Sequence, residues 1–345
     1  MASSGLYVNP NTGQTQAGLQ PFRNAIINGD MRINQRGTST NLASLSTIAD
    51  VSPGSYVVDR WNTLRNAFVA GGTMGQGTAL TNLDLPYLDA GITTFSRIGR
   101  ANGNTLTNTI NLMYYMETQD SIKYAGKKIT LSFYYKTGSN FSGTAVYAYI
   151  FQGTGTDQSL RVGFTNETGL SINCNASLTW QRISFTINVA TTTTQIAVRF
   201  LHIPTGTALA ADYFDITGVQ LELGSVATPF EVRPFPVELQ LCQRYYETQL
   251  AYNSAGSTNS QYGTYIYYKF GVQKRSSSAS ITVYDSNNVA QRITAVANNT
   301  GSVSHNLQFA FDAIWNDGFI MRIFQNPTII YSAVFGSAYT VNAEL

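Results

Sequence analysis

Several segments of this chain alternate apolar and polar side chains with a period of two. In KKITLSFYYKTG, Ile129, Leu131 and Phe133 share one side of an extended chain. The segments GTAVYAYIFQG, WQRISFTINV and TQIAVRFLHI repeat the pattern, and turns rich in glycine, asparagine and threonine separate them. One apolar side with a period of two is typical of an antiparallel sheet that is covered on one face. The pattern therefore predicts an all-β fold, in which residues 22–230 close as a jelly-roll β-sandwich.

The remaining segments divide the chain into further parts. Residues 1–21 are polar and aperiodic, which predicts either a disordered leader or an arm that orders only against a partner. Residues 231–249 combine a proline strap, which cannot form a central strand, with a short linking helix expected from Val237 to about Thr248. Strand-like segments return in residues 250–345 and predict a second, smaller β-sandwich domain.

The segment DYFDITGVQLELG, directly before the strap, is the expected last strand of the first sandwich. An unbroken alternation places Phe214, Ile216 and Gly218 on one side and Val219 and Leu221 on the other. The prolines that follow are stiffer than a glycine- and serine-rich linker, so the join is expected to hold the second domain in a fixed direction.

The composition argues against several functional classes. Charged residues make up only 12% of the chain, about half the usual share, and the net charge is +2 without a basic run. Nucleic-acid binding therefore has little electrostatic support. No segment reaches the roughly 18 apolar residues of a membrane span, and no signal-peptide pattern begins the chain, so synthesis in a cytoplasm without membrane insertion is expected. Cys174 and Cys242 are expected to be buried thiols, with a structural bridge as the alternative.

No catalytic constellation stands out from the sequence. The G-x-S-x-G, H-E-x-x-H and P-loop motifs are absent, and the glycine-rich segment GTGTDQS does not open a helix. The two histidines, His202 and His305, are too few for a histidine-rich metal centre. Carboxylate pairs such as Asp212 and Asp215 exist, but nothing marks them as the facing pair that glycoside hydrolysis requires. The sequence predicts no enzyme, no catalytic residue and no cofactor.

Aromatic residues gather on the side of the predicted strands that faces away from the core. Tyr134, Tyr147, Tyr149 and Phe151 fall on this side, and Arg199 joins them because its neighbours in the strand point inward. An exposed apolar patch of this kind is rarely left bare. It either stacks on sugar rings or is buried by the second sheet or by another subunit, so these five residues are candidates for a glycan site or an interface.

A second group of aromatic residues lies in the segment QYGTYIYYKF. Tyr262 and Tyr265 are candidates for a recognition surface, because tyrosine combines a large contact area with a polar tip and little rotamer freedom. Packing within the sheet is the alternative for the group. Tyr267 and Tyr268 follow each other in a strand, so one of them is expected to point inward, but not both.

Several segments, taken in order, resemble a family of bacteriophage and prophage tail proteins. They are NAIINGDMRINQRG, YVVDRWNT, GTGTDQS, GVQLELGSVATPFEVRP with ELQLCQRYYE, FGVQKRSSSASITVYDS and a C-terminal NAEL, and they span nearly the whole chain after about residue 22. The resemblance implies a virion protein of the tail, assembled in the host cytoplasm, most simply a trimeric tail fibre with a jelly-roll domain similar to carbohydrate-binding modules. Its implied partners are other tail proteins, through residues 1–21, and a host-surface glycan or receptor.

The carbohydrate-module likeness makes predictions at individual residues. Such modules open with a strand like NGDFE and carry an aspartate in their last strand, and the two acids often hold a structural calcium. Here NGDMRIN places Arg32 at the position of the first acid, whereas DYFDI keeps Asp215. We therefore expect an ion pair between Arg32 and Asp215, or one with Asp30, in place of a metal; Asp30 and Asp215 remain the calcium candidates. In the motif DRW, Trp61 is expected in the core rather than stacked on a sugar.

Two other functional classes remain open beside the tail fibre. One is a purely structural virion component, such as a capsid decoration, a head fibre or a tail connector. The other is a glycan-degrading enzyme of the tailspike type.

Overall fold

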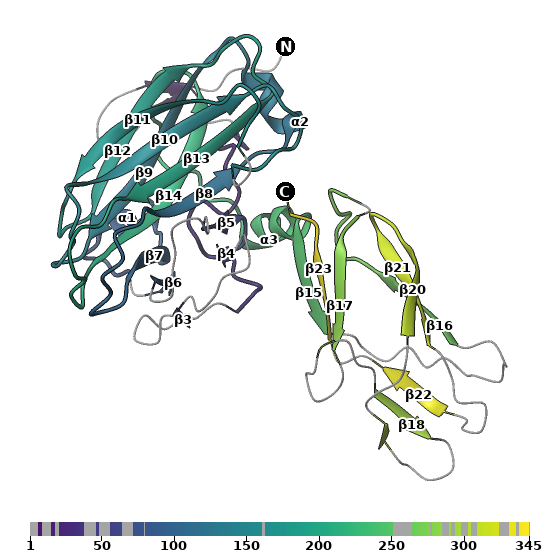
Figure 1. The fold of residues 1–345 in the computed structure, drawn as a ribbon. Coiled ribbons are helices and arrows are strands. Elements are labelled where there is room, and N and C mark those ends of the chain that lie inside the picture. Colours follow the sequence, from purple (N-terminus) through teal and green to yellow (C-terminus); the bar gives the residue numbers. More distant parts are fainter. Residues whose placement is uncertain are drawn as a thin grey trace. The chain divides into compact units, whose positions relative to one another are not determined.

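The structure is a computed structural model that divides into two compact units, Met1–Pro234 (unit 1) and Phe235–Leu345 (unit 2), and each is described by itself (Figure 1). It describes residues 6–8, 15–17, 21–37, 46–47, 56–63, 72–78, 80–160, 163–250, 264–276, 278–284, 290, 294–297, 303–304, 309–323, 331–335 and 338–344.

Unit 1 is a sandwich of two six-stranded antiparallel sheets, as the alternating segments predict. The first, here called the β9 sheet, has the order β12 (Gln181–Asn188), β9 (Lys128–Thr137), β14 (Tyr213–Leu223), β7 (Phe95–Arg100), β6 (Gly72–Gly77) and β3 (Ser46–Thr47). The second, the β10 sheet, has the order β11 (Thr168–Asn175), β10 (Ala145–Gly153), β13 (Gln195–His202), β8 (Ile110–Tyr115), β5 (Trp61–Asn62) and β4 (Tyr56–Val58). Successive strands change sheet between β9 and β10 and again between β11 and β12, which is the jelly-roll arrangement.

Short elements surround the sandwich. They are α1 (Leu85–Ala90), α2 (Thr118–Ser121), the 3-10 helix η3 (Ile122–Tyr124) and an antiparallel pair of β1 (Leu6–Val8) with β2 (Thr15–Ala17). The β1–β2 pair lies within the predicted N-terminal arm, whose other residues before Pro21 are outside the described part of the chain.

The core of unit 1 fills the space between the two sheets. Ile129, Leu131 and Phe133 of β9 all belong to it, which confirms the side that the alternation assigns to them. Trp61 is fully buried there, 5.2 Å from the ring of Tyr114, and its indole N–H donates to the backbone oxygen of Asn28 at 3.0 Å. The prediction that Trp61 is a core residue is therefore confirmed.

Strand β14 departs from the expected alternation at Gly218. Phe214 and Ile216 belong to the core before this residue, and Val219 and Leu221 belong to it afterwards. The pairing with β9 shifts register between Thr217 and Gln220, so the strand contains a β-bulge. Gly218 has φ +59, and a Cβ on it would lie 2.6 Å from the ring of Tyr134. The unbroken alternation was therefore wrong, because the bulge reverses which parity of residues points inward.

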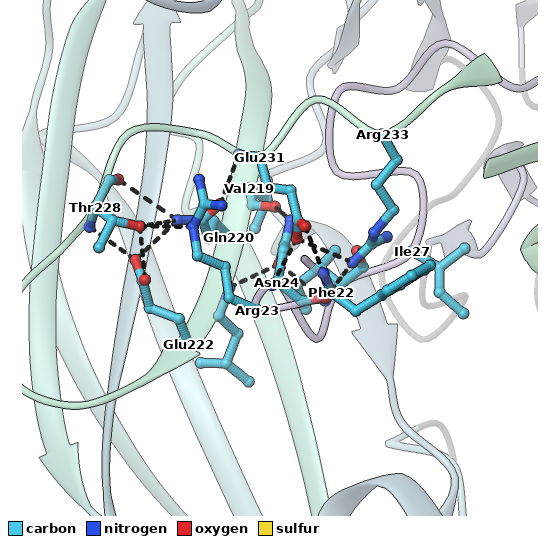
Figure 2. Close-up of polar contacts among 12 residues, drawn as sticks. Phe22, Arg23, Asn24, Ile27, Val219, Gln220, Glu222, Thr228, Glu231 and Arg233 are labelled. Atoms are coloured by element: carbon cyan, nitrogen blue, oxygen red, sulfur yellow. Dashed lines mark hydrogen bonds and ion pairs between the residues drawn. The ribbon is translucent and has the colours of Figure 1, made fainter. Parts of the chain in front are cut away.

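The proline strap after β14 is tied by hydrogen bonds to the first residues of the sandwich, as Figure 2 shows. The carboxylate of Glu231 accepts from the backbone N–H groups of Phe22, at 2.6 Å, and of Asn24, at 2.9 Å. Arg23 donates to the hydroxyl of Thr228 at 2.9 Å and to the backbone oxygen of Pro229 at 2.7 Å. We call these contacts the strap clasp; they join two segments that lie about 200 residues apart in the sequence.

Unit 2 begins with α3 (Phe235–Gln243) and contains three small antiparallel sheets. Their orders are β15 (Tyr246–Leu250), β23 (Ala338–Asn342), β17 (Ser280–Tyr284); β16 (Thr264–Lys269), β21 (Gly318–Ile323), β20 (Phe309–Ile314); and β19 (Val303–Ser304), β18 (Thr294–Ala297), β22 (Tyr331–Phe335). The first two sheets share a core that includes Phe319 and Val341. The helix ends at Gln243, before the predicted Thr248, because the residues that follow it pair with β23.

A buried ion pair fixes the start of unit 2. The ammonium group of Lys274 contacts the carboxylate of Glu247, and both side chains are fully buried. Lys274 also donates to the backbone oxygens of Gln243, at 2.7 Å, and Val272, at 3.0 Å. These bonds join the end of α3 and strand β15 to the loop that contains Lys274. The two cysteines, Cys174 in unit 1 and Cys242 in unit 2, are free and buried, as predicted.

Candidate functional site

Strand β10 places three aromatic side chains on the outer side of its sheet. Val146, Ala148 and Ile150 point into the core, so Tyr147, Tyr149 and Phe151 point away from it. Arg199 of β13 lies directly opposite Tyr149 in the strand pairing and therefore shares its side. We call Tyr147, Tyr149, Phe151 and Arg199 the β10 platform.

The rings and the guanidinium of the β10 platform are stacked on one another. Tyr149 and Phe151 have ring centroids 5.3 Å apart and planes only 16° from parallel. The guanidinium carbon of Arg199 lies 4.5 Å from the ring centroid of Phe151 and 5.2 Å from that of Tyr149. Both distances are within the range of cation–π attraction, so Arg199 and the two rings pack against one another. Phe151 is only 6% exposed, contrary to its predicted place in an exposed patch, whereas Tyr149 and Arg199 are half-buried.

Strand β11 supplies a low border for this surface. It lies beside β10 (Figure 1), and the pairing places Gly169, Ser171 and Asn173 opposite Phe151, Tyr149 and Tyr147, respectively. All three β11 residues are exposed. The ring of Phe151 covers Gly169, where a Cβ would lie 2.6 Å from a ring carbon. Glycine at this position therefore allows the ring to lie flat across the neighbouring strand. The sequence pattern did not indicate these β11 residues, because only the strand pairing brings them beside β10.

The half of this sheet face that β13 and β8 form is buried. On β13 and β8, the residues whose side chains lie on the same side of the sheet as Tyr149 and Arg199 are buried. They are Ala197, Leu201, Asn111, Met113 and Tyr115. The accessible part is therefore confined to the edge formed by β10 and β11, with Arg199 at its inner boundary.

The surroundings of Arg199 disfavour its positive charge. The side chain is half-buried, and its Nε is buried without a hydrogen-bond partner in the described part of the structure. Burial lowers the pKa of Arg199 from its ordinary value, although Tyr149 and Glu167 partly offset this effect. Glu167 makes no ion pair with Arg199, and its carboxylate instead accepts from the backbone N–H of Phe164 at 3.0 Å.

Tyr134 does not belong to this surface, contrary to the sequence prediction. It lies on β9 in the other sheet, is 1% exposed, and packs with Phe95, Trp180 and Phe230. Its hydroxyl donates to Asp89 at 2.9 Å, and burial raises its pKa well above the usual tyrosine value. The alternation assigned its side correctly, but that side of the β9 sheet is covered by the segment that contains α1 and by the proline strap.

The predicted ion pair between Arg32 and Asp215 is also wrong. The fully buried Asp215 accepts two hydrogen bonds from the guanidinium of Arg97, at 2.7 and 2.8 Å, and lies 3.9 Å from Lys136. The strand pairing explains this choice, because Arg97 of β7 is directly opposite Asp215 of β14. Arg32 lies 3.1 Å from Asp30, which is the alternative that the sequence left open. Each of the two calcium candidates thus faces a guanidinium, and no group of three metal-ligating side chains occurs among the described residues.

One histidine lies in a buried polar network whose composition resembles a catalytic triad. Asp212 accepts from Arg100 Nε at 2.7 Å and from the hydroxyl of Ser142 at 3.0 Å, and His202 Nε2 lies 3.4 Å from its other oxygen. The hydroxyl thus donates to the carboxylate rather than to the imidazole, and His202 is fully buried. Burial lowers the pKa of His202 and keeps it neutral. This geometry holds loops together, because Arg100 also donates to the backbone oxygens of Leu106, Thr205 and Gly206.

Unit 2 carries a smaller exposed aromatic pair. Tyr267 is 54% exposed, and its ring centroid lies 6.3 Å from that of Trp315, which is 42% exposed. Tyr268 instead packs on Phe319 at 4.7 Å, so one of the two adjacent tyrosines points inward and the other outward, as predicted. Tyr262 and the side chain of Tyr265 lie outside the described residues.

An open pocket of about 620 Å³ adjoins this pair. It is lined by Lys269, Phe270, Gly271, Gln273, Trp315, Asn316 and Asp317. The sequence pattern did not indicate Trp315, because a single tryptophan at the end of a strand carries no periodic signal.

Among the helices that the structure describes, none is long and apolar enough to cross a lipid bilayer.

Comparisons with known proteins find similarity in structure only. No family model and no curated protein matches the sequence. The enzymatically active domain of tailspike protein 4 from bacteriophage CBA120 is similar with a TM-score of 0.37 and 14% identity, over 60% of this chain and 22% of that one. A family 4 carbohydrate-binding module is similar with a TM-score of 0.31 and 16% identity, over 54% of this chain and 100% of that one.

A further similar structure is described as a sugar-binding protein of Bacteroides thetaiotaomicron VPI-5482. It has a TM-score of 0.33 and 14% identity, over 58% of this chain and 100% of that one. The match to the tailspike protein covers less than a quarter of the tailspike chain. Likenesses this distant carry no argument about what this chain binds or catalyses.

Proposed function

We propose that this protein binds saccharide on the β10 platform and serves as a bacteriophage tail fibre that attaches the virion to a host-surface glycan. The observation that carries the binding proposal is the partly exposed pair of Tyr149 and Arg199 at the edge of the β10 sheet, packed against the buried ring of Phe151. The proposal includes no catalysis: the platform has no facing pair of carboxylates, and the one buried Ser–His–Asp group is arranged to hold loops together.

The chemistry of the platform suits a sugar ring. A pyranose has an apolar C–H face and a rim of hydroxyl groups. The partly exposed ring of Tyr149 offers an apolar surface for the C–H face, and the buried ring of Phe151, stacked on it, holds it in place. Arg199 and the exposed side chains of Ser171 and Asn173 lie beside the rings, where they can bond to hydroxyls at the rim. A few polar groups around an apolar surface are typical of small-ligand sites.

The role in the virion rests on the ordered sequence resemblance to phage tail proteins. In this proposal residues 1–21 attach the protein to other tail proteins, unit 1 and unit 2 form the part that meets the host surface, and three copies assemble into a fibre. A shallow site of this kind binds a single glycan weakly, but several copies on one particle raise the overall avidity by orders of magnitude.

A glycan array tests the binding proposal most broadly. The wild-type protein is expected to bind a restricted set of glycans, and Tyr149→Ala is expected to lose that binding. Tyr87→Ala is the matched control, because Tyr87 is an exposed tyrosine of α1, which packs on the other sheet. Loss of binding in the Tyr149 variant alone supports the proposal. Equal binding by both variants, or a fall in polymer size after incubation with host polysaccharide, would contradict it.

A further inference from the structure

The structure points to the kind of saccharide: we propose that the β10 platform binds an acidic sugar, one whose ring carries a carboxylate, and that Arg199 is the residue that binds this carboxylate. This inference rests on the proposed function, because it concerns the same surface. It adds a ligand class that neither the sequence nor the aromatic stack alone indicates.

Arg199 is an exception among the arginines of this protein. Within the described part of the chain, every other arginine has a hydrogen-bond acceptor, a carboxylate partner or another recorded interaction. These arginines are Arg23, Arg32, Arg36, Arg60, Arg97, Arg100, Arg182, Arg233, Arg244, Arg275 and Arg322. Among the described arginines, Arg199 alone has neither an acceptor nor an acid within bonding distance, and its guanidinium lies against the rings of Tyr149 and Phe151.

The geometry of the guanidinium leaves suitable donors for a ligand. Only Nε of Arg199 is buried without a partner, so the two terminal nitrogens remain open to solvent. The stack against Tyr149 and Phe151 restricts the plane of the group, and a restricted guanidinium loses less freedom when it forms paired hydrogen bonds. Two parallel N–H donors in a fixed plane match the two oxygens of a carboxylate.

The local charges also favour an anion. Glu167 is the acid whose field acts on Arg199, but its carboxylate is held by the backbone N–H of Phe164 and forms no ion pair with the guanidinium. A neutral sugar would remove water from Arg199 and leave the positive charge without an opposite charge, which is costly in a partly dry site. A carboxylate would replace that water with a charge-assisted hydrogen bond, which is about twice as strong as a neutral one.

The test compares polymers that differ only in the carboxylate. Polygalacturonate, alginate and a glucuronate-containing polysaccharide are titrated calorimetrically against the wild-type protein, each beside the same polymer after its carboxyl groups have been reduced to alcohols. At least one acidic polymer is expected to bind about tenfold or more tightly than its reduced form. Arg199→Gln should abolish this preference while weak binding of the reduced polymer remains.

Glu167→Gln is the complementary variant, because it removes a negative charge near Arg199 and keeps an oxygen for the N–H of Phe164. It should tighten binding of the acidic polymer several-fold at low salt and leave the reduced polymer unchanged. Equal wild-type affinity for acidic and reduced polymers would overturn the acidic assignment and leave saccharide binding intact. A preference that survives in Arg199→Gln would also overturn the assignment. No binding to any of the polymers, together with an empty glycan array, would overturn the proposed function itself.

Discussion

Arg199 on β13 and Phe151 on β10 are diagonal neighbours on two paired strands, with the guanidinium carbon 4.5 Å from the ring centroid and no acid bonded to the charge. A residue in this state is expected to serve a ligand rather than the fold. Cation–π attraction contributes about 0.5–2 kcal/mol, which is comparable with the cost of partly burying an unpaired charge.

Replacement of Arg199 by methionine should therefore leave the stability of the protein nearly unchanged. Methionine keeps a long side chain over the two rings and removes the unpaired charge, so the free energy of unfolding should stay within about 1 kcal/mol of wild type or rise. Chemical denaturation measures this, and the same sample should lose acidic-saccharide binding. A loss of several kcal/mol would show that Arg199 has a structural role.

The buried Asp212 predicts a specific loss of stability in acid. Burial alone would raise its pKa, but the neighbouring His202 and hydrogen bonds from the backbone of Ser142 and from Arg100 outweigh burial and lower the pKa to about 2. A carboxyl whose pKa is lower in the folded state stabilises the fold above its unfolded value, near 4, and loses that contribution as the pH falls towards 2. The contribution at neutral pH is about 2 kcal/mol.

The measurement is the free energy of unfolding of wild type and Asp212→Asn in urea between pH 6 and pH 2. Asparagine keeps the shape of the side chain but cannot carry the charge, so the variant should be less stable at pH 6. The difference between the two proteins should shrink as the pH falls below 4. A difference that stays constant across this range would contradict the assigned pKa direction.

The bulge in β14 predicts that Gly218 resists substitution. Gly218→Ala should destabilise unit 1 by about 3 kcal/mol, because the positive φ disfavours alanine and the new Cβ would lie 2.6 Å from the ring of Tyr134. Gly224→Ala is the matched control, since Gly224 also has a positive φ but has open space around its Cβ position. The control should cost only about 1–2 kcal/mol, from the backbone alone. Equal costs, measured by urea denaturation, would remove the bulge contact as the cause.

The ion pair of Lys274 and Glu247 predicts a large effect confined to unit 2. Glu247→Gln leaves the fully buried ammonium without an opposite charge and should destabilise unit 2 by about 3–5 kcal/mol. Asp312→Asn breaks the ion pair between Asp312 and Arg322. The side chains of Arg322 and Asp312 are 35% and 28% exposed, respectively, so the loss of this pair should cost less than about 1 kcal/mol. Hydrogen exchange followed by peptide should show faster exchange in unit 2 of the first variant only. Faster exchange in unit 1 as well would contradict this account.

The sequence predicts strands β9, β10, β12 and β13 of unit 1 well because each of them has one apolar side. It also places Tyr149 and Arg199 on the correct side of their strands, because their sequence neighbours Ile150 and Val198, respectively, are core residues. The same pattern fails for Tyr134, because alternation gives the side of a strand but not what covers that side. It fails at Gly218, because the bulge inserts a residue without a change in composition.

The least predictable feature was which residues from distant parts of the sequence contact each other. The pairing of Asp215 with Arg97 depends on which strands are neighbours, and alternation is silent on that order. For the same reason Gly169 and Ser171 could not be placed beside Phe151 and Tyr149. The strap clasp between Glu231 and Phe22 joins segments that no local pattern connects.

The structure of the protein in complex with its tightest-binding saccharide tests the central claim most directly. We expect a sugar ring stacked on Tyr149, with its carboxylate within hydrogen-bond distance of the terminal nitrogens of Arg199. A saccharide bound elsewhere, for example in the pocket beside Trp315, with the β10 platform bare or covered by a second copy of the chain, would contradict the account.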